Sequence, residues 1–207
     1  MSDTIADWAT NLMQTLGAPG AGLAIALENL FPPLPSEVIL PLAGFTAGRG
    51  GMGLAEALIW TTVGSVVGAL ALYWLGAALG RDRLLAIARR MPLIKVSDIE
   101  RTEAFFQRHG GKAVFFGRMV PVFRSLISIP AGVERMPLGR FTLLTTLGSA
   151  LWNTVFILAG YLLGDNWALV EGYVGIGTNI VIGLIVLAFL TFAGVRLAER
   201  HKERKRS

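Results

Sequence analysis

Three long apolar segments place the strongest constraint on what this chain can fold into. They comprise residues 54–80, 138–164 and 173–197, and each is long enough to cross a hydrocarbon core of about 30 Å as an α-helix. The third segment is the clearest, because it carries no charge before Arg196. The 207-residue chain is 53% hydrophobic and its mean hydropathy is +0.58, well above that of an ordinary soluble domain. We therefore expect an all-α integral membrane protein with several spans.

A weaker apolar segment precedes these spans. Residues 1–27 are expected to form an N-terminal helix whose part from 16 to 27 is rich in glycine and alanine. That part could span the membrane, lie at its surface or begin a broken helix, and its composition leaves all three readings open.

The basic residues are concentrated in two blocks. Eight of the nineteen lie between Arg81 and Lys112, and six more lie between Arg196 and Arg206. Such blocks could bind nucleic acid, but in a chain this apolar they are better explained by the positive-inside rule. The linker 81–112, the tail 198–207 and the C-terminus are therefore expected in the cytoplasm, and the acidic loop 165–172 outside.

The linker 81–112 is amphipathic. Ser97 and Glu100 are spaced as a capping box, which predicts a helix that begins there and stops at Gly110 and Gly111. Helices of this kind lie on anionic headgroups, although a purely structural connector fits the sequence equally well.

An internal repeat becomes visible when the chain is shifted by 88 residues. The segment "PLPSEVILPLAG" (33–44) then aligns with "PVFRSLISIPAG" (121–132), and Tyr73 aligns with Tyr161 without a gap. Each half therefore contains a broken apolar segment, 28–48 or 113–136, followed by one of the spans 54–80 and 138–164.

The broken segments are typical of re-entrant hairpins, which enter and leave the membrane on the same side. A hairpin adds no net crossing and the following helix adds one, so the second half is expected to be inverted relative to the first. The segment 173–197 adds a C-terminal transmembrane helix. The residues expected to break the helices and shape a site between the hairpins are Pro33, Pro35, Gly44, Pro121, Pro130 and Gly132.

Two arginines lie within the second broken segment, on either side of Pro121. Arginine stays charged, so Arg118 and Arg124 need water, a counter-ion or an anionic ligand inside the membrane. We interpret them as a site for a phosphate headgroup, since each guanidinium can bind a phosphate bidentately. The alternatives are that they extend to lipid headgroups or pair with Glu28 and Glu37, which bracket the first break.

Glu28 and Glu37 have two possible roles. A carboxyl in a low-dielectric cavity can bind a proton, which would couple transport to a proton gradient, or it can remain ionised as the static partner of an arginine. The sequence leaves both open.

Small and polar residues within the spans have mainly structural interpretations. Gly64, Gly68, Gly76 and Gly80 are spaced for close helix packing, and Asn153 suits either a cavity or an interhelical hydrogen bond.

Catalysis has little support in the sequence. There is no cysteine, the two histidines (His109 and His201) lie outside the spans, and no metal-ligand cluster or phosphate-binding glycine loop is present. We therefore expect no enzyme, no metal and no cofactor.

Four stretches carry a family resemblance: "ENLFPPLPSEVILPLAGF", "GSVVGALALYWLGAALGR", "GRMVPVFRSLISIPAG" and "WNTVFILAGYLLG". They closely resemble the DedA family, whose shared region is the VTT or SNARE-associated domain, over residues 28–165. The family's important acidic pair and arginine pair fall on Glu28, Glu37, Arg118 and Arg124.

The resemblance implies a multi-pass protein of the bacterial inner membrane with paired re-entrant helices. It also implies translocation of a lipid, best supported for undecaprenyl phosphate, which is recycled during envelope synthesis. The expected function is thus a proton-dependent flippase for a phosphate-headgroup lipid. A phospholipid scramblase, as proposed for eukaryotic relatives, and a small-ion/proton transporter are the alternatives. The expected partners are membrane lipids and not nucleic acid, and the sequence leaves self-association open.

Overall fold

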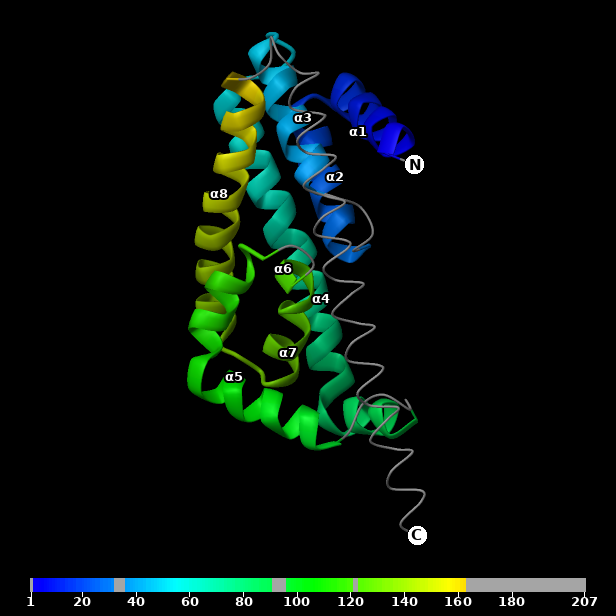
Figure 1. Cartoon of the computed structure of the whole chain (residues 1–207), viewed down its shortest axis with the longest axis vertical. Helices are drawn as coiled ribbons and strands as arrows, with labels where there is room; N and C mark the ends of the chain where they lie inside the picture. Colours follow the sequence, from blue (N-terminus) through cyan, green and yellow to red (C-terminus); the bar gives the residue numbers. More distant parts are fainter. Residues whose placement is uncertain (1, 32–35, 91–95, 121–122, 163–207) are drawn as a thin grey trace, which may run out of the picture.

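The fold was examined in a computed structural model, which describes residues 2–31, 36–90, 96–120 and 123–162 (Figure 1). This part of the chain is helical and contains no strand. Its helices are α1 (Ser2–Leu16), α2 (Ala18–Leu30), α3 (Ser36–Gly48), α4 (Leu54–Arg90), α5 (Val96–Gly117), α6 (Phe123–Leu126), α7 (Ser128–Val133) and α8 (Leu138–Leu162).

The two longest apolar helices, α4 and α8, pack against each other and run along the length of the molecule (Figure 1). Their portions Leu54–Arg81 and Leu138–Leu162 are long and apolar enough to cross a membrane. Both helices begin at the residue where the sequence predicts a span to begin. At Gly80 the backbone of α4 leaves the helical conformation with φ +65°, a left-handed value that glycine adopts without strain.

The N-terminal region differs from the prediction of one helix over residues 1–27. The chain breaks at Gly17, which has φ +65°, and α2 then continues to Leu30. Pro19, near the start of α2, is well placed because the first turn of a helix needs no N–H donor. Glu28 therefore lies in the last turn of α2. Residues 32–35, which follow α2, lie outside the described part of the chain, and the three possibilities for the segment 16–27 stay predictions.

The predicted helix end at Gly110 and Gly111 is wrong. Neither glycine has a positive φ, and α5 continues to Gly117. The physical reason is packing: the following residues include the buried Val114, and a Cβ on Gly111 would lie 2.6 Å from a guanidinium nitrogen of Arg140 on α8. Helix α5 thus continues past both glycines, packs against α8 and crosses the expected boundary at 112 and 113.

Two pairs of short helices, α2 with α3 and α6 with α7, lie at opposite ends of the α4–α8 pair. We call each of these pairs an interrupted unit. In Figure 1, α2 and α3 occupy the upper half, whereas α6 and α7 occupy the lower half. Helix α3 packs mainly against α8, and α7 packs mainly against α4.

The α3–α8 crossing and the α4–α7 crossing are both formed by glycines that lie against backbone carbonyls of the facing helix. A Cβ on Gly44 would lie 2.0 Å from the carbonyl oxygen of Ile157, and a Cβ on Gly132 would lie 2.0 Å from that of Tyr73. Gly160 and Gly76 likewise lie against the carbonyls of residues 41 and 129. The contacting residues in the hairpins differ by 88 (132 − 44, 129 − 41), but those in the long helices differ by 84 (157 − 73, 160 − 76). The contacting residues thus follow the offset of 88 in the broken segments and an offset of 84 in the spans, while the internal repeat itself stays a prediction.

Glycines in these helices mostly serve packing. Gly64 and Gly68 face the backbone of α2, and Gly76 faces that of α7, as the sequence predicts. Gly80 is the exception, because it has no neighbour within 4 Å and forms the kink. Gly44 and Gly132 lie inside α3 and α7, so their predicted role as helix breakers is wrong. Pro130 lies within the short helix α7.

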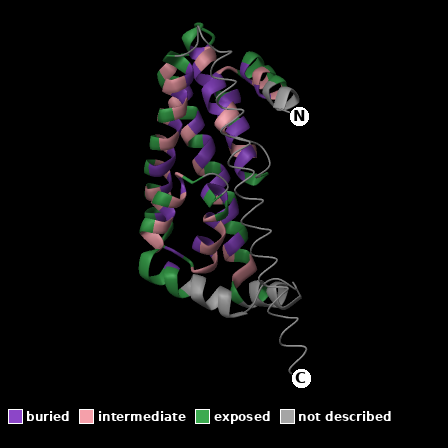
Figure 2. Cartoon of the chain, viewed as in Figure 1, coloured by how far each residue is buried: buried purple, intermediate pink, exposed green. Residues whose placement is uncertain are grey.

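Many exposed positions of α4 and α8, green in Figure 2, carry large apolar side chains, whereas several polar side chains of the chain are buried. This distribution is the reverse of that in a soluble protein and is typical of a helix bundle in lipid. The exposed apolar side chains include Ile59, Trp60, Val63, Val67, Trp74, Leu143, Leu147, Leu151 and Val155.

Several predicted features lie outside the described residues. These are the breaks at Pro33, Pro35 and Pro121, the loop 165–172, the C-terminal span 173–197 and the tail 198–207.

Candidate functional site

A buried ion pair joins the two interrupted units. Arg124 of α6 donates through Nη2 to Oε2 of Glu28, in the last turn of α2. Both residues are almost completely buried, with exposed fractions of 3% and 4%. Since burying either charge alone is costly, each stabilises the other in the protein interior. The sequence allowed that the arginines pair with the glutamates. The structure confirms this pairing for Arg124 and Glu28.

Asn29 follows Glu28 and Ser125 follows Arg124, and these two residues are joined by a hydrogen bond. Ser125 donates through Oγ to Oδ1 of Asn29, at 3.1 Å. Asn29 can lie against α4 because Gly68 faces it, and a Cβ on Gly68 would lie 2.6 Å from the Asn29 Cβ. A two-residue contact therefore fixes α6 on the end of α2.

The second arginine lies just beyond the end of α5. Its aliphatic stem packs on α8 at Gly148, where an added Cβ would lie 3.0 Å from the Arg118 Cβ. Nη2 of Arg118 donates to Oγ of Ser128 at 2.7 Å. Its Nε is buried and has no hydrogen-bond partner in the described part of the chain. Arg118 is therefore a buried cation, 2% exposed, with donor capacity to spare.

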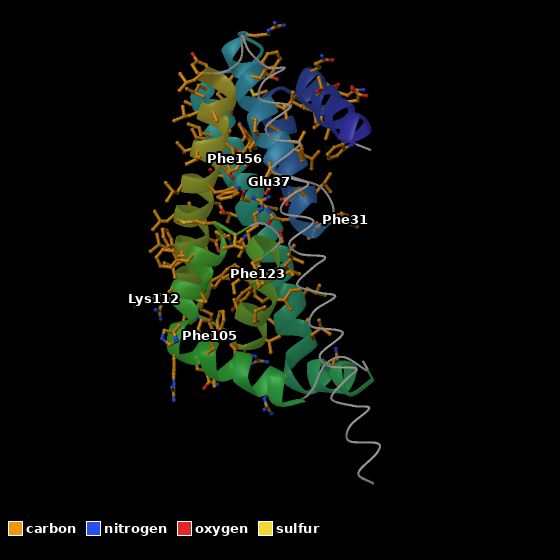
Figure 3. The ribbon with its side chains drawn as sticks, in the orientation of Figure 1. Phe31, Glu37, Phe105, Lys112, Phe123 and Phe156 are labelled. Atoms are coloured by element: carbon orange, nitrogen blue, oxygen red, sulfur yellow. The ribbon has the colours of Figure 1, made fainter. Side chains whose placement is uncertain are left out.

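Glu37 lies in the first turn of α3 and is half-buried, near mid-height of the bundle (Figure 3). No hydrogen bond or ion pair joins it to another described residue. We refer to the ion pair of Glu28 and Arg124, together with the buried Arg118, as the central cluster.

A further polar contact lies where α4 meets α8. Asn153 donates through Nδ2 to Oγ of Ser65 at 3.3 Å, which confirms the predicted interhelical hydrogen bond. Oδ1 of Asn153 and Oγ1 of Thr145 are buried without a partner among the described residues. With Ser149, these side chains extend the polar interior along α8 on either side of the Arg118 stem.

Sequence reasoning missed Asn29, Ser125 and Ser128. Single serines and asparagines within apolar segments are common, and only their contacts with the charged residues make them part of the site. For Asn29 and Ser125, the available signal was their position next to Glu28 and Arg124 in the sequence; Ser128 offered no such signal.

Comparison with known proteins places this site in a family. A model of the VTT domain matches residues 34–162. An alkaline phosphatase-like protein of Lactococcus lactis is 39% identical over 199 residues, covering 92% of this chain and 93% of the relative. Undecaprenyl phosphate transporter A of Bacillus subtilis is 34% identical over 186 residues, or 89% of each chain. Protein DedA of Escherichia coli is 27% identical over 179 residues, covering 83% of this chain and 75% of the relative. No solved structure matches.

The chain belongs to the DedA family. A further relative, 36% identical over 187 residues, bears the name of an uncharacterized membrane protein of Bacillus subtilis. The apolar surface of α4 and α8 agrees with that name, and we treat this DedA protein as a membrane protein.

The name of the Lactococcus relative mentions a phosphatase. Within the described residues no group of three or more His, Cys, Asp or Glu could hold a metal ion. The polar interior of this DedA protein is instead built from arginines, carboxylates, hydroxyls and amides, a set that suits binding of an anion and transfer of a proton.

Proposed function

We propose that this protein moves a lipid with a phosphate headgroup across the bacterial inner membrane, with undecaprenyl phosphate as its substrate and a proton gradient as its driving force. The observation that carries the proposal is the buried ion pair between Arg124 and Glu28 of the other interrupted unit, together with the buried Arg118, whose Nε has no partner among the described residues. The names of two relatives, undecaprenyl phosphate transporter A of Bacillus subtilis and of Staphylococcus aureus, support the choice of substrate.

In the proposed mechanism, Arg124 exchanges its partner Glu28 for the phosphate headgroup. A phosphate entering the cluster is negatively charged, like the Glu28 carboxylate, and can replace that carboxylate on Arg124. Protonation of Glu28 would release Arg124 to hold the phosphate, and the unpartnered Nε of Arg118 supplies a further donor. Proton binding and lipid binding are then linked, because each favours the same open form of the ion pair.

The proposed arrangement of the chain is an inverted repeat of two re-entrant hairpins, each followed by a spanning helix. Its support is the glycine-to-carbonyl contact that recurs at the α3–α8 and α4–α7 crossings. The substrate site would then lie where the two interrupted units meet, as in other transporters built from inverted repeats.

Cysteine labelling tests this topology. The chain contains no cysteine, so single cysteines can be introduced without background labelling. Arg49 precedes α4 and Ala104 follows its far end, and both are exposed. We expect Ala104→Cys to react with a membrane-impermeant maleimide from the cytoplasmic side only, and Arg49→Cys from the outside only. Labelling of both from one side would exclude a crossing by α4.

Transport itself is tested in proteoliposomes that contain labelled undecaprenyl phosphate and an imposed pH gradient. We expect gradient-driven movement by the wild type and none by Glu28→Gln or Glu37→Gln, since glutamine cannot exchange a proton. Phosphate-lipid binding should persist in Glu37→Gln, where both arginines and the ion pair remain. The measured quantity is the rate at which the headgroup becomes accessible in the opposite leaflet.

Glu56→Gln is the matched control. Glu56 is exposed and accepts a hydrogen bond from the Gly53 N–H at 3.3 Å, far from the arginines in sequence and near one end of α4. Its transport rate should equal that of the wild type. Gradient-independent movement of phosphatidylethanolamine at the same rate would instead show a scramblase, and full gradient-driven transport by both glutamine variants would show that the carboxylates are static partners.

A further inference from the structure

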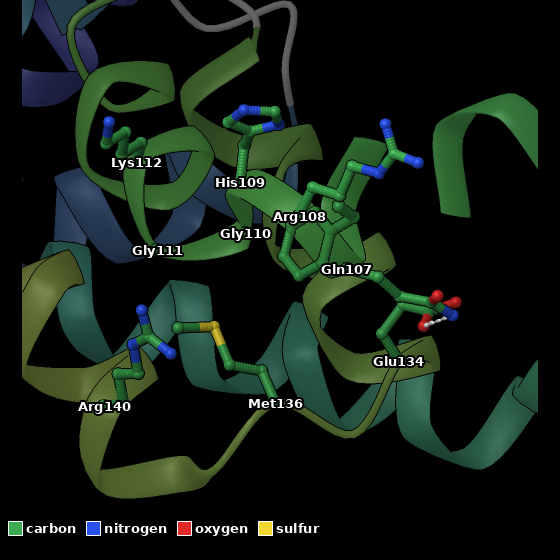
Figure 4. A pocket seen from close by; sticks show the side chains of 10 residues that line it. Gln107, Arg108, His109, Gly110, Gly111, Lys112, Glu134, Met136 and Arg140 are labelled. Carbon is green, nitrogen blue, oxygen red and sulfur yellow. Dashed lines mark hydrogen bonds between the residues drawn. The ribbon is translucent and has the colours of Figure 1, made fainter. Parts of the chain in front are cut away.

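A second basic region lies at the lower end of the molecule, away from the central ion pair. There a pocket of about 460 Å³ opens between α5 and the turn that leads into α8 (Figure 4). This volume lies within the range of small-molecule sites, which is about 300–1,000 Å³.

The pocket carries an excess of positive charge. Arg108, Lys112 and Arg140 line it, together with the single acid Glu134. Glu134 accepts a hydrogen bond from the Gln107 side chain at 3.2 Å (Figure 4), whereas no hydrogen bond or ion pair joins the three cations to another described residue. Like charges this close repel one another, and an anion that binds among them relieves the repulsion.

Two buried apolar side chains also line the pocket. They are Phe106 and Met136, which are 6% and 7% exposed. The guanidinium of Arg140 lies close to the backbone of α5 at Gly111. The pocket thus combines three cations with apolar side chains, which suits an amphiphile better than a free ion.

We propose that this pocket is a second anion site, which binds the phosphate headgroup of a membrane lipid at the bilayer surface. It is distinct from the central cluster. Lys112 lies on α5 six residues before Arg118, which follows the end of α5, or about 9 Å at the rise of a helix; Arg140 precedes Gly148 by eight residues on α8, or about 12 Å. The assignment rests on the charge and shape of the pocket and does not depend on the proposed transport.

The test counts bound lipid on the full-length protein in detergent by native mass spectrometry, with a short-chain phosphatidic acid as the probe. The double variant Lys112→Gln/Arg140→Gln removes two of the three cations. We expect it to lose one bound phosphatidic acid relative to the wild type, with an affinity at least about tenfold weaker at that site. Arg49→Gln/Arg83→Gln changes the net charge equally, uses exposed arginines outside the pocket and should bind as the wild type does.

The outcomes separate this site from the central one. If the central cluster also binds a phosphate lipid, the wild type holds two lipids; the pocket variant then loses one and Arg124→Gln loses the other. If the central cluster binds none, the wild type holds one lipid, and the pocket variant loses it. Equal stoichiometry and affinity in the wild type and the pocket variant would overturn the proposal. Displacement of the pocket lipid by inorganic phosphate at equal concentration would overturn the assignment to a lipid in favour of a soluble phosphate compound.

Discussion

Arg124→Ala is expected to abolish transport and to lower the free energy of unfolding by about 3–5 kcal/mol, the usual cost of breaking a buried ion pair by removing one partner. The substitution leaves the Glu28 carboxylate buried without its cation and removes the anchor between α6 and α2. Thermal unfolding in detergent, with transport measured on the same preparation, reports both effects.

A second variant separates the structural role of this pair from its functional role. Glu28→Leu/Arg124→Leu removes both charges and leaves no unpaired ion, so it should be more stable than Arg124→Ala while remaining inactive. Arg83→Ala, an exposed arginine on α4, is the control and should change stability by no more than about 0.5 kcal/mol. If the double variant were as unstable as Arg124→Ala, the ion pair would not account for the loss.

The central site was predictable from the sequence because its chemistry is rare. An arginine or a glutamate within an apolar segment needs a partner, and this requirement alone singles out Glu28, Arg118 and Arg124. Which arginine pairs with which glutamate was not predictable, since it depends on how the ends of α2 and α6 meet. Asn29 and Ser125 were missed for the same reason, as neither residue type is unusual in a membrane helix.

Some helix boundaries were also predictable from the sequence, and others were not. The starts of α4 and α8 follow from abrupt changes in hydropathy at Leu54 and Leu138. In contrast, Gly110 and Gly111 have the composition of a helix end but lie inside α5, because the approach of Arg140 on α8 outweighs local propensity. Glycine within a membrane helix thus marks either an end or a close contact, and only packing distinguishes the two.

The spacing of the contacting residues differs between the broken segments and the spans. The hairpin residues Gly44 and Gly132 align at an offset of 88, but the carbonyls that they contact align at 84. An offset of four residues preserves the face of an α-helix, so apolar sequences match almost equally well at either value. The alignment of Tyr73 with Tyr161 therefore carried less information than the glycines.

These glycine contacts lead to the other large expected effect. Gly44→Ala and Gly132→Ala each place a Cβ 2.0 Å from a backbone carbonyl oxygen, whereas such contacts essentially never fall below 3.0 Å. The helices must separate by about 1 Å, and neither carbonyl can turn away because each belongs to a helix. We expect each variant to lose about 3 kcal/mol of stability, at the upper end of the range for overpacked cores.

Gly139→Ala provides the matched control for these two variants. Gly139 lies in the first turn of α8, has no positive φ and has no atom within 4 Å of the position of an added Cβ. Alanine there should leave stability unchanged or raise it slightly, because alanine favours the helix more than glycine does. Thermal unfolding of the three variants in detergent gives the comparison. Losses of similar size at Gly44 and Gly132 would indicate that the two crossings are equivalent, as an inverted repeat requires, whereas tolerance of alanine at both would contradict the close packing on which that equivalence rests.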